Sequence, residues 1–498
     1  MGVAFGIMAM LTALPPALAA PGFDARLSGR VFAAALNFAT PRLLDANSAR
    51  QLAEWGLHGI TVLDPSLTVT GHGDMLTLSD HDHQIATATA PPEGDAEAWG
   101  HTAAGLSEAA FAASPTLRHA GGQALVQSFF DEMFTHLDPY SRYVPPAPAE
   151  AARDRLAVDA SAGLGLVRQH GGTVIADIVP GGPGFAAGAR IGDRILAIDG
   201  QRVSNASLAR VQALLTGPEG TLLDVQVRGL DGQTRELDLG LAYVPPETVF
   251  TERQDGLLIL RISSYTSNTA ERLSQAVEAG MAASPPPRAL VLDLRGNRGG
   301  LLRQAVNAVA LFAEQGTIAS TAGRDPQATH AWRIDGGGDL THGLHLIILV
   351  DGRTASAAEI MAAALADLGR GVVVGSATLG KGLVQTITRL PDGGELFVTW
   401  SRVLAPRGWP IQSLGVMPQL CTSQGPDATR AALAALADGR QPAADAIARA
   451  RAARPPLAAA AALILRQSCP AASGTDLDLS AARFLADNPG AYEAALLK

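Results

Sequence analysis

The chain has 498 residues, of which 47% are hydrophobic, so it can bury a large core divided among two to four domains. Its net charge is −9, and it contains no long run of Lys and Arg. Because phosphate binding relies on clustered basic residues, this composition argues against a nucleic-acid partner.

An apolar run at residues 3–14 is followed by two prolines and then by small residues up to Ala20. This pattern predicts a signal peptide over residues 1–20 and a periplasmic or secreted protein. The first Lys or Arg is Arg26, so the usual basic segment is absent, and either the true start lies upstream or the signal is atypical. No other stretch reaches about 18 apolar residues, and we expect a soluble mature chain.

Residues 21–110 form an N-terminal region of uncertain fold. Apolar spacing favours short helices at 32–38 and 48–55 and strands at 60–63, 67–70 and 75–78. His and Asp residues cluster between His72 and His83, which raises the hypothesis of a metal site. Polar loops of this composition are commoner than metal sites, and we therefore predict no metal.

Residues 111–159 are predicted to be helical. The apolar spacing of QALVQSFFDEMFTHL (123–137) indicates a helix that faces a core, and a second helix is expected over 149–158.

Residues 160–240 have the pattern of a small β-rich module. Strands are predicted at 163–166, 173–179 and 222–228, a turn, strand and second turn at 187–200, and a helix at 207–215. This order of elements resembles a PDZ domain, and the run from Gly188 to Gly200 is its most specific part.

The PDZ resemblance implies that the backbone N–H groups of Leu164, Gly165 and Leu166 receive the terminal carboxylate of an extended peptide. The peptide would add as a strand between that segment and the helix, whose apolar lining would favour nonpolar tails. The lining residues would be Leu208, Val211 and Leu215. The alternative is that these side chains are simply the core of the module.

Residues 241–424 alternate between predicted strands and helices, which predicts an α/β core with a mainly parallel sheet. The strands are expected at 256–262, 289–294, 345–350 and 372–375, and the helices at 268–282, 301–312 and 356–368. The remaining residues, 425–498, are alanine-rich and are predicted to be helical.

Ser356 is predicted to open a helix directly after a strand and a turn. A hydroxyl there lies beside unpaired N–H groups and the positive end of the helix dipole, which can stabilise an oxyanion. The alternative is a structural role, since Ser356 and Glu359 also have the spacing of a capping box.

Lys381 lies between two glycines and among apolar residues, with no carboxylate within five positions on either side. A lysine acts as a base only if burial lowers its pKa from about 10.4 toward about 7 to 8, and this setting allows it. The alternative is a surface lysine in a glycine turn. If Gln385 orients the lysine amine, residues 380–385 must form a helical turn, because residues four apart are neighbours on one face of a helix but lie about 13 Å apart along a strand.

A phosphate-binding loop is a third interpretation, because GSATLGK (375–381) matches the first seven positions of that motif. Position 382 is Gly, so the hydroxyl that would bind Mg²⁺ is missing, and β-branched residues replace the required helix. We therefore predict no nucleotide partner.

The two cysteines, Cys421 and Cys469, could form one disulfide or remain separate buried thiols, and their spacing does not decide between these states.

The order of motifs between residues 111 and 424 resembles the carboxyl-terminal processing proteases, which are also called tail-specific serine peptidases. The resemblance rests on LDPYSRY (137–143), the PDZ-like module, DLRGNRGG (293–300), TASAAE (354–359), GKGLVQ (380–385) and GVMP (415–418). Two departures are mild: Gln419 stands where an acidic residue is common, and Ala358 where Ser is frequent.

This resemblance implies Ser356 as nucleophile, Lys381 as general base and Gln385 as the group that orients the lysine. It also implies an oxyanion hole made by the backbone N–H groups of Gly300 and Ala357. The expected activity is a serine endopeptidase that needs no cofactor, cuts through an acyl-enzyme and recognises protein substrates with nonpolar C-terminal tails, with an adaptor protein as a further partner. The rival hypothesis is a catalytically inactive PDZ scaffold that binds tails and hydrolyses nothing.

Overall fold

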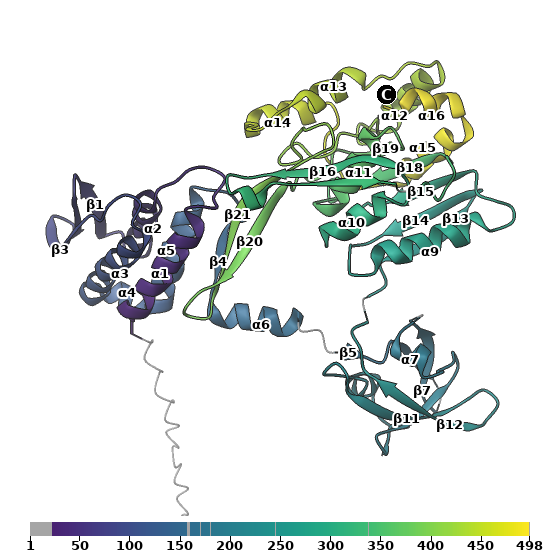
Figure 1. The fold of residues 1–498 in the computed structure, drawn as a ribbon, viewed down its shortest axis with the longest axis horizontal. Coiled ribbons are helices and arrows are strands. Elements are labelled where there is room, and N and C mark those ends of the chain that lie inside the picture. Colours follow the sequence, from purple (N-terminus) through teal and green to yellow (C-terminus); the bar gives the residue numbers. More distant parts are fainter. Residues whose placement is uncertain are drawn as a thin grey trace, which may run out of the picture. The chain divides into compact units, whose positions relative to one another are not determined.

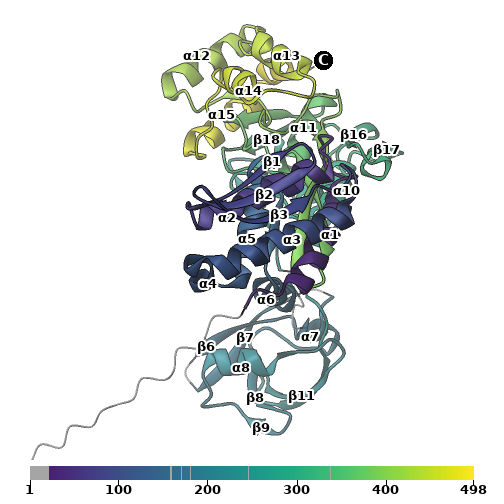
Figure 2. The ribbon, with the colours of Figure 1, turned by 90° about the vertical axis from the view of Figure 1, so that its left-hand side faces the viewer.

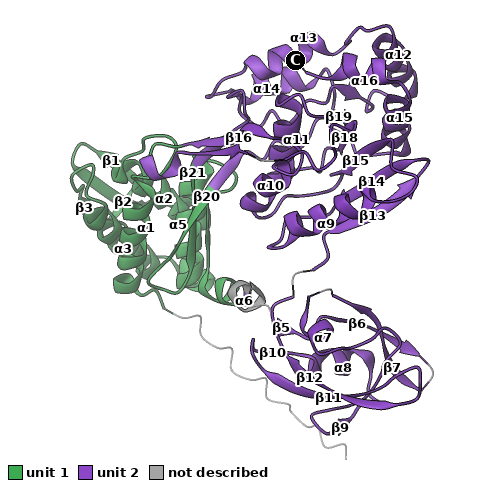
Figure 3. Ribbon diagram, turned by 45° about the vertical axis from the view of Figure 1, so that its right-hand side comes forward, with its two compact units in different colours: residues 1–150, 323–325, 385–400 green, residues 151–322, 326–384, 401–498 purple. Residues whose placement is uncertain are grey.

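The computed structural model describes residues 22–156, 160–169, 171–179, 181–244, 246–336 and 338–497. The predicted signal peptide lies outside these residues. The chain divides into two compact units, of which the first contains residues 1–150, 323–325 and 385–400 and the second contains the rest (Figure 3). Residues 385–400 therefore group with the N-terminal unit, although they fall inside the range 241–424 that the sequence assigns to the core.

The first unit is built from packed helices and a small sheet. Its main helices are α1 (Ala25–Ala39), α2 (Ala49–Leu63), α3 (Ala96–Ala113), α4 (Pro115–Ala120) and α5 (Gly122–Thr135). Helix α1 packs along α3, and α2 packs along α5 (Figure 2). Phe32, Trp99 and Phe130 are fully buried in the shared core.

Several sequence predictions fall in this unit. The helix at 123–137 is confirmed by α5, but the strand expected at 60–63 is wrong, because these residues continue α2. Ile60 is buried against the helical core, and this tertiary packing outweighs its β propensity. The strands expected near 67–70 and 75–78 are confirmed by β1 (Leu67–His72) and β2 (Met75–Asp80), and an unpredicted β3 (His83–Thr89) completes an antiparallel meander.

The region between this unit and the PDZ-like module is helical, as expected. Helix α6 (Pro146–Leu156) begins three residues before the predicted start at 149, and residues 157–159 lie outside the described part of the chain.

The PDZ-like module is an antiparallel sheet with two short helices. Its strand order is β12-β11-β8-β7-β6, so β6 lies at an edge. The strands are β6 (Leu164–Gln169), β7 (Gly172–Ile178), β8 (Arg194–Ile198), β11 (Leu222–Arg228) and β12 (Thr234–Gly240), and the helices are α7 (Pro183–Ala186) and α8 (Leu208–Leu214). The sequence analysis predicted these strands apart from β12.

The second unit also contains a six-stranded sheet whose order is β13-β14-β15-β18-β19-β22 (Figure 1). Strand β13 pairs antiparallel with β14, and the other pairs are parallel, so the predicted mainly parallel core is confirmed. The strands are β13 (Val249–Gln254), β14 (Leu257–Ile262), β15 (Ala289–Asp293), β18 (Leu346–Val350), β19 (Val372–Gly375) and β22 (Leu420–Cys421). Strands β15, β18 and β19 are buried on both faces, which explains their continuous apolar runs.

Helices cover both faces of this sheet. One face packs against α9 (Thr269–Met281), α10 (Leu302–Val309) and α11 (Ala357–Asp367). The other face packs against α12 (Pro426–Ala437), α15 (Asp476–Asp487) and α16 (Pro489–Ala495). Side chains along β15 alternate between the two helical layers: Leu290 and Leu292 face the first layer, and Ala289 and Val291 face the second. The alanine-rich C-terminal helices are therefore one full layer of the core.

The remaining elements extend from this core. Strands β16 (Gln315–Ala322) and β17 (His330–Asp335) form a hairpin, and β20 (Leu383–Arg389) and β21 (Glu395–Leu404) each run from one unit into the other. The N-terminal end of β21 pairs with β4 (Arg142–Val144). Two further C-terminal helices are α13 (Ala444–Ala452) and α14 (Ala459–Arg466). Among the described residues, no helix combines the length and apolar character that a membrane crossing requires.

We predict that the C-terminal layer contributes directly to the stability of the core. Leu485 of α15 is fully buried against the sheet, so Leu485→Ala should lower the free energy of unfolding by about 2 to 5 kcal/mol in a urea titration. Leu463→Ala is the control, because Leu463 is 63% exposed, and it should change the value by less than about 0.5 kcal/mol. If both substitutions changed the free energy of unfolding equally, α15 would not contribute to the stability of the core.

Candidate active site

Three loops follow the carboxyl ends of adjacent parallel strands. Residues 294–300 follow β15, residues 351–356 follow β18, and residues 376–382 follow β19. Because neighbouring parallel strands end at the same edge of a sheet, the topology brings these loops together. They carry Gly300, Ser356 and Lys381, which are three of the residues that the sequence analysis selected.

Ser356 directly precedes α11, as predicted, and its backbone has φ 58° and ψ −122°. This is a sparsely populated conformation for a residue with a side chain, and it persists only where the surroundings hold it. The next residue, Ala357, is the first of the helix, so its N–H has no partner within the helix. The hydroxyl-bearing residue thus stands beside unpaired helix N–H groups, as the sequence analysis expected.

The loop after β15 lies against Ser356. A Cβ atom added to Gly299, whose φ is 96°, would lie 2.8 Å from the Cβ of Ser356. A Cβ at Gly300, whose φ is 143°, would lie 2.2 Å from the carbonyl oxygen of Tyr265. Only glycine fits at either position, and this explains why a glycine pair ends the loop.

Asp351 binds two of these loops together. Its Oδ1 accepts hydrogen bonds from the backbone N–H groups of Gly296 at 2.9 Å, Arg353 at 2.9 Å and Thr354 at 3.0 Å. Burial by itself raises the pKa of Asp351, but hydrogen bonds from the backbone of Gly296, Gly474 and Arg353 and from the Arg353 side chain outweigh burial and lower the pKa below its ordinary value. A second link is the hydrogen bond from the Ala355 N–H to the carbonyl oxygen of Asn297, at 2.9 Å.

Glu359 joins the loop that carries Ser356 to the loop that carries Lys381. Its carboxylate is fully buried, and its Oε2 accepts hydrogen bonds from the N–H of Ser356 at 2.8 Å and from the N–H of Lys381 at 2.9 Å. Its Oε1 accepts from the Thr378 hydroxyl at 2.5 Å and from the Gly380 N–H at 2.6 Å. All four partners are donors, so a carboxylate satisfies them.

The shared carboxylate fixes the separation of the two candidate catalytic residues. Their backbone nitrogens both bind one oxygen atom, so they lie no farther apart than the sum of those two hydrogen bonds, 2.8 and 2.9 Å. Burial raises the pKa of Glu359, and the four donors act in the opposite direction. The side chain of Lys381 is itself half-buried.

The capping-box interpretation and the catalytic interpretation of Ser356 are therefore compatible. The Glu359 carboxylate does reach back to the Ser356 N–H, as a capping box requires. The same carboxylate also binds the residues that lead to Lys381.

The helical turn expected at residues 380–385 is wrong. Residues 383–389 form strand β20, so Gln385 does not share a helical face with Lys381. The Gln385 amide donates to the Thr399 hydroxyl at 3.1 Å, and that hydroxyl donates to Asp138 at 2.7 Å. Alternating β-branched residues after Gln385 favour the strand, and they could have excluded the turn.

The phosphate-binding loop is not formed. Residues 376–382 follow β19 as such a loop would, but the chain continues into β20, where nucleotide binding requires a helix. In the ranges that the structure describes, no group of three or more His, Cys, Asp and Glu side chains is arranged to hold a metal ion.

Sequence reasoning missed the roles of Asp351, Thr378 and Glu359. The available signal was Glu359 itself, which with Asp367 is one of two acidic residues in the otherwise apolar helix predicted at 356–368, because an acid that is buried in such a helix needs several donors. Asp351 and Thr378 carried no comparable pattern, since their partners are distant in the sequence.

The candidate peptide-binding residues lie on β6 and α8, which contact each other in the PDZ-like module. Leu164, Gly165 and Leu166 form the start of the edge strand and are half-buried. Leu208 is also half-buried, but Val211 and Leu215 are buried in the module core, as the alternative interpretation held.

The chain matches two family models. Peptidase family S41 matches residues 256–421, and the PDZ domain matches residues 174–229. The S41 match contains the three loops, and the PDZ match contains most of the module.

Curated relatives match more than half of this chain. The carboxy-terminal-processing protease of Bartonella bacilliformis is 32% identical over 309 residues, which cover 61% of this chain and 70% of that protein. The chloroplastic C-terminal processing peptidase of Tetradesmus obliquus is 32% identical over 312 residues, covering 57% of this chain and 64% of that one. A solved structure, the photosystem II D1 C-terminal processing protease, is 30% identical and covers 61% of this chain and 87% of its own, with a TM-score of 0.37.

We predict that the Glu359 carboxylate cannot be replaced by an amide. Glu359→Gln puts an NH₂ donor against backbone N–H groups, so at least one buried donor loses its partner and the free energy of unfolding should fall by about 2 kcal/mol. Glu271→Gln, on an exposed site of α9, is the matched control and should change stability by less than about 0.5 kcal/mol. Equal stability of the two variants in urea would contradict the four-donor assignment.

Proposed function

Since this chain belongs to the carboxy-terminal processing proteases, serine peptidases of family S41, we propose that it hydrolyses peptide bonds with Ser356 as nucleophile and Lys381 as general base. The observation that carries the proposal is the Glu359 carboxylate, which binds the backbone N–H groups of both residues through one oxygen atom. No other pair of a hydroxyl and an amine was selected by the sequence analysis.

The proposed reaction begins when the Lys381 amine takes the proton of the Ser356 hydroxyl. The Ser356 oxygen attacks the carbonyl carbon of the peptide bond, and the N–H groups of Gly300 and Ala357 stabilise the negative oxygen of the tetrahedral intermediate. The lysine ammonium then gives its proton to the departing amine, which leaves an ester on Ser356. Water, deprotonated by the lysine, hydrolyses this ester and restores the serine. The proposed reaction needs no cofactor.

Two features support the oxyanion hole in this proposal. Gly300 requires glycine because its backbone approaches Tyr265 closely, and the preceding Gly299 leaves no side chain beside Ser356. Ala357 is the first residue of α11, so its N–H points out of the helix end at which the positive charge of the dipole concentrates. The role of Gln385 in orienting Lys381 is implied by the family resemblance alone, because residues 383–389 form a strand and the helical turn expected for that role is absent.

We also propose that the PDZ domain binds the nonpolar C-terminal tails of protein substrates. Strand β6 is an edge strand with α8 beside it, and this is the arrangement in which a peptide adds as a further strand. The half-buried Leu164, Leu166 and Leu208 would supply an apolar lining. The tail carboxylate would bind the N–H groups of residues 164–166.

A periplasmic or secreted location is part of the proposal. It is supported by the disulfide between Cys421 and Cys469, because disulfides persist mainly in oxidising compartments. An adaptor that delivers substrates remains a candidate partner. The rival function, an inactive scaffold that binds tails, would leave the intact Ser356, Lys381 and Glu359 arrangement without a use.

We expect Ser356→Ala and Lys381→Ala each to lower kcat/KM by at least about a thousand-fold on a protein with a nonpolar tail, since each removes a reacting group. The measurement is cleavage followed by gel electrophoresis and mass spectrometry, with circular dichroism to verify folding. Ser274→Ala removes a hydroxyl from α9, away from the proposed site, and should leave kcat/KM unchanged. Hydrolysis by a folded Ser356→Ala variant would refute the nucleophile.

We further expect tail recognition to depend on the PDZ domain, and we propose that tail binding moves this domain and admits the substrate. Replacing the last three residues of a nonpolar tail with Asp should raise KM about tenfold or more for the wild type, because charged side chains would be desolvated in an apolar groove. Deleting residues 160–240 should abolish the difference between the two substrates. If the deletion variant cleaved the nonpolar-tailed protein at the wild-type rate, the gating role would be contradicted. If the wild type had the same KM for both substrates, tail selection would be contradicted.

A further inference from the structure

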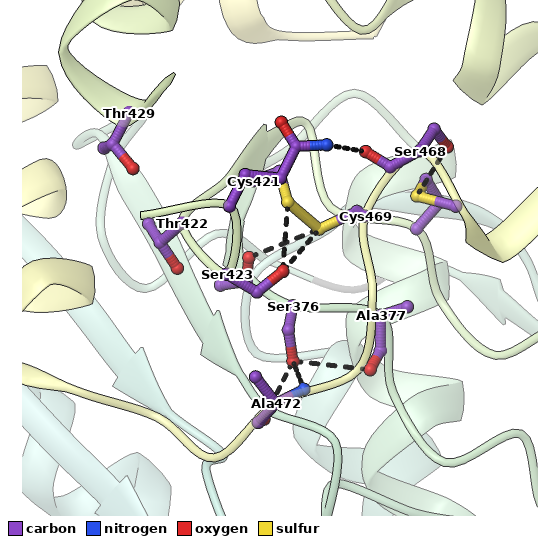
Figure 4. The surroundings of a disulfide bond; sticks show 12 residues. Ser376, Ala377, Cys421, Thr422, Ser423, Thr429, Ser468, Cys469 and Ala472 are labelled. Carbon is purple, nitrogen blue, oxygen red and sulfur yellow. Dashed lines mark hydrogen bonds between the residues drawn. A yellow bond between two sulfur atoms is a disulfide. The ribbon is translucent and has the colours of Figure 1, made fainter. Parts of the chain in front are cut away.

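The segment between α14 and α15 contacts all three loops of the proposed active site. This segment, residues 466–478, is called the C-terminal brace here, and it lies beyond residue 421, where the S41 family match ends. Its contacts with the loops are made mostly by backbone atoms and by the buried side chain of Asp478. Figure 4 shows its first half beside the disulfide.

The disulfide fastens the first part of the brace to the sheet. Cys469 is buried and is bonded to Cys421, the last residue of β22. Cys421 is paired with Gly375 at the end of β19, immediately before the loop that carries Lys381. The Ser423 hydroxyl lies 3.3 Å from the sulfur of Cys421 and 3.6 Å from that of Cys469 (Figure 4).

The middle of the brace holds two loops through one residue. The carbonyl oxygen of Ala472 accepts from the N–H of Gly352 at 2.7 Å and from the hydroxyl of Ser376 at 3.0 Å. The Ala472 N–H donates to the Ser376 hydroxyl at 3.1 Å, as the dashed lines of Figure 4 show. Gly352 belongs to the loop before Ser356, and Ser376 belongs to the loop before Lys381.

The far end of the brace holds the third loop. Asp478 is buried, and its Oδ2 accepts from Arg295 at 3.1 Å and from the Thr475 N–H at 2.8 Å. Its Oδ1 accepts from the Thr422 hydroxyl at 2.6 Å. Arg295 also donates to the Thr475 carbonyl oxygen at 2.9 Å. The loop that leads to Gly300 is therefore attached to the same segment.

The fit between brace and loops is close. A Cβ at Gly352 would lie 3.1 Å from the nitrogen of Ala472, and a Cβ at Gly474 would lie 2.4 Å from the Cδ of Arg295. The Gly474 N–H donates to Oδ2 of Asp351 at 3.3 Å, so the brace also reaches the residue that joins two of the loops. A side chain at Gly474 would require Arg295 to move, and one at Gly352 would press against the backbone of Ala472.

The brace begins at Arg466, whose guanidinium donates to the Leu414 carbonyl oxygen at 2.7 Å. A Cβ at Gly415 would lie 2.7 Å from this guanidinium and 2.6 Å from the carbonyl oxygen of Thr378, so Arg466 lies beside the residue whose hydroxyl binds Glu359. The brace thus places a positive charge close to the buried carboxylate that links Ser356 and Lys381.

We propose that the C-terminal brace is a positioning element for the peptidase reaction, fastened by the Cys421–Cys469 disulfide at one end and by Asp478 at the other. It holds the loops of Gly300, Ser356 and Lys381 in one fixed arrangement, and its release lowers the rate of the chemical step without weakening tail binding. The expected loss of rate rests on the proposed function. The claim that the brace holds the three loops rests on the contacts alone.

The test compares Cys421→Ser/Cys469→Ser and Asp478→Asn with wild type at a temperature where circular dichroism shows all of them folded. The Asp478→Asn substitution removes the negative charge that binds Arg295, and the control is Asp476→Asn, an exposed acid two residues earlier. Small displacements of reacting groups lower rates steeply, so we expect kcat to fall about tenfold or more, with KM for the tailed substrate within twofold of wild type. Asp476→Asn should match wild type in both.

Amide hydrogen exchange supplies a readout that does not depend on activity. Both variants should lose protection by about tenfold or more in residues 351–357 and 376–381, while β15 keeps its protection. Lower thermal stability with unchanged kcat and unchanged exchange in those loops would show that the brace only stabilises the fold, and it would overturn the proposal. Absence of hydrolysis by wild type would instead contradict the proposed function, and the exchange measurement would still decide the structural part.

Discussion

One buried carboxylate holds the proposed site together. Glu359 is enclosed by protein and accepts hydrogen bonds from the backbone of Ser356, the backbone of Lys381 and two further donors between them in the fold. A buried acid is costly unless its acceptor sites are occupied, and the loops on both sides supply those donors. The two loops therefore keep their conformation because the carboxylate binds them, and the carboxylate is stable in the interior because the loops supply its hydrogen-bond donors. A substitution in the loops or at Glu359 should disturb both.

The sheet decides where this arrangement can form. Strands β15, β18 and β19 are adjacent and parallel, so the loops that follow them meet at one edge without any long connection. The C-terminal helices α12, α15 and α16 cover the second face of the sheet, and the connection into α15 passes across the same edge. The region beyond the peptidase family match is thus part of both the core and the surroundings of the site. Its position gives the C-terminal brace access to all three loops.

Predictions from the sequence were correct where a feature depends on neighbouring residues and wrong where it depends on tertiary contacts. The buried strands and the helix after Ser356 were predicted because continuous apolar runs and helical spacing are local properties. The helical turn at 380–385 was wrong because its only support was the assumed partnership of Gln385 with Lys381, whereas the alternating residues after it pair as a strand. The strand expected at 60–63 was wrong because burial of Ile60 in a helical core outweighed local preference.

By itself, the sequence determined the α/β class and the order of the motifs, and it selected Ser356 and Lys381 as the proposed reacting pair, because strand and helix patterns and motif spacing are properties of the chain itself. Only the tertiary structure decided that Glu359 joins those two residues, that Cys421 and Cys469 are bonded and that residues 466–478 contact the three loops. Apart from the local contact between Ser356 and Glu359, these contacts join residues about twenty to nearly two hundred positions apart, and they depend on the strand order of the sheet and on the layer that packs over it.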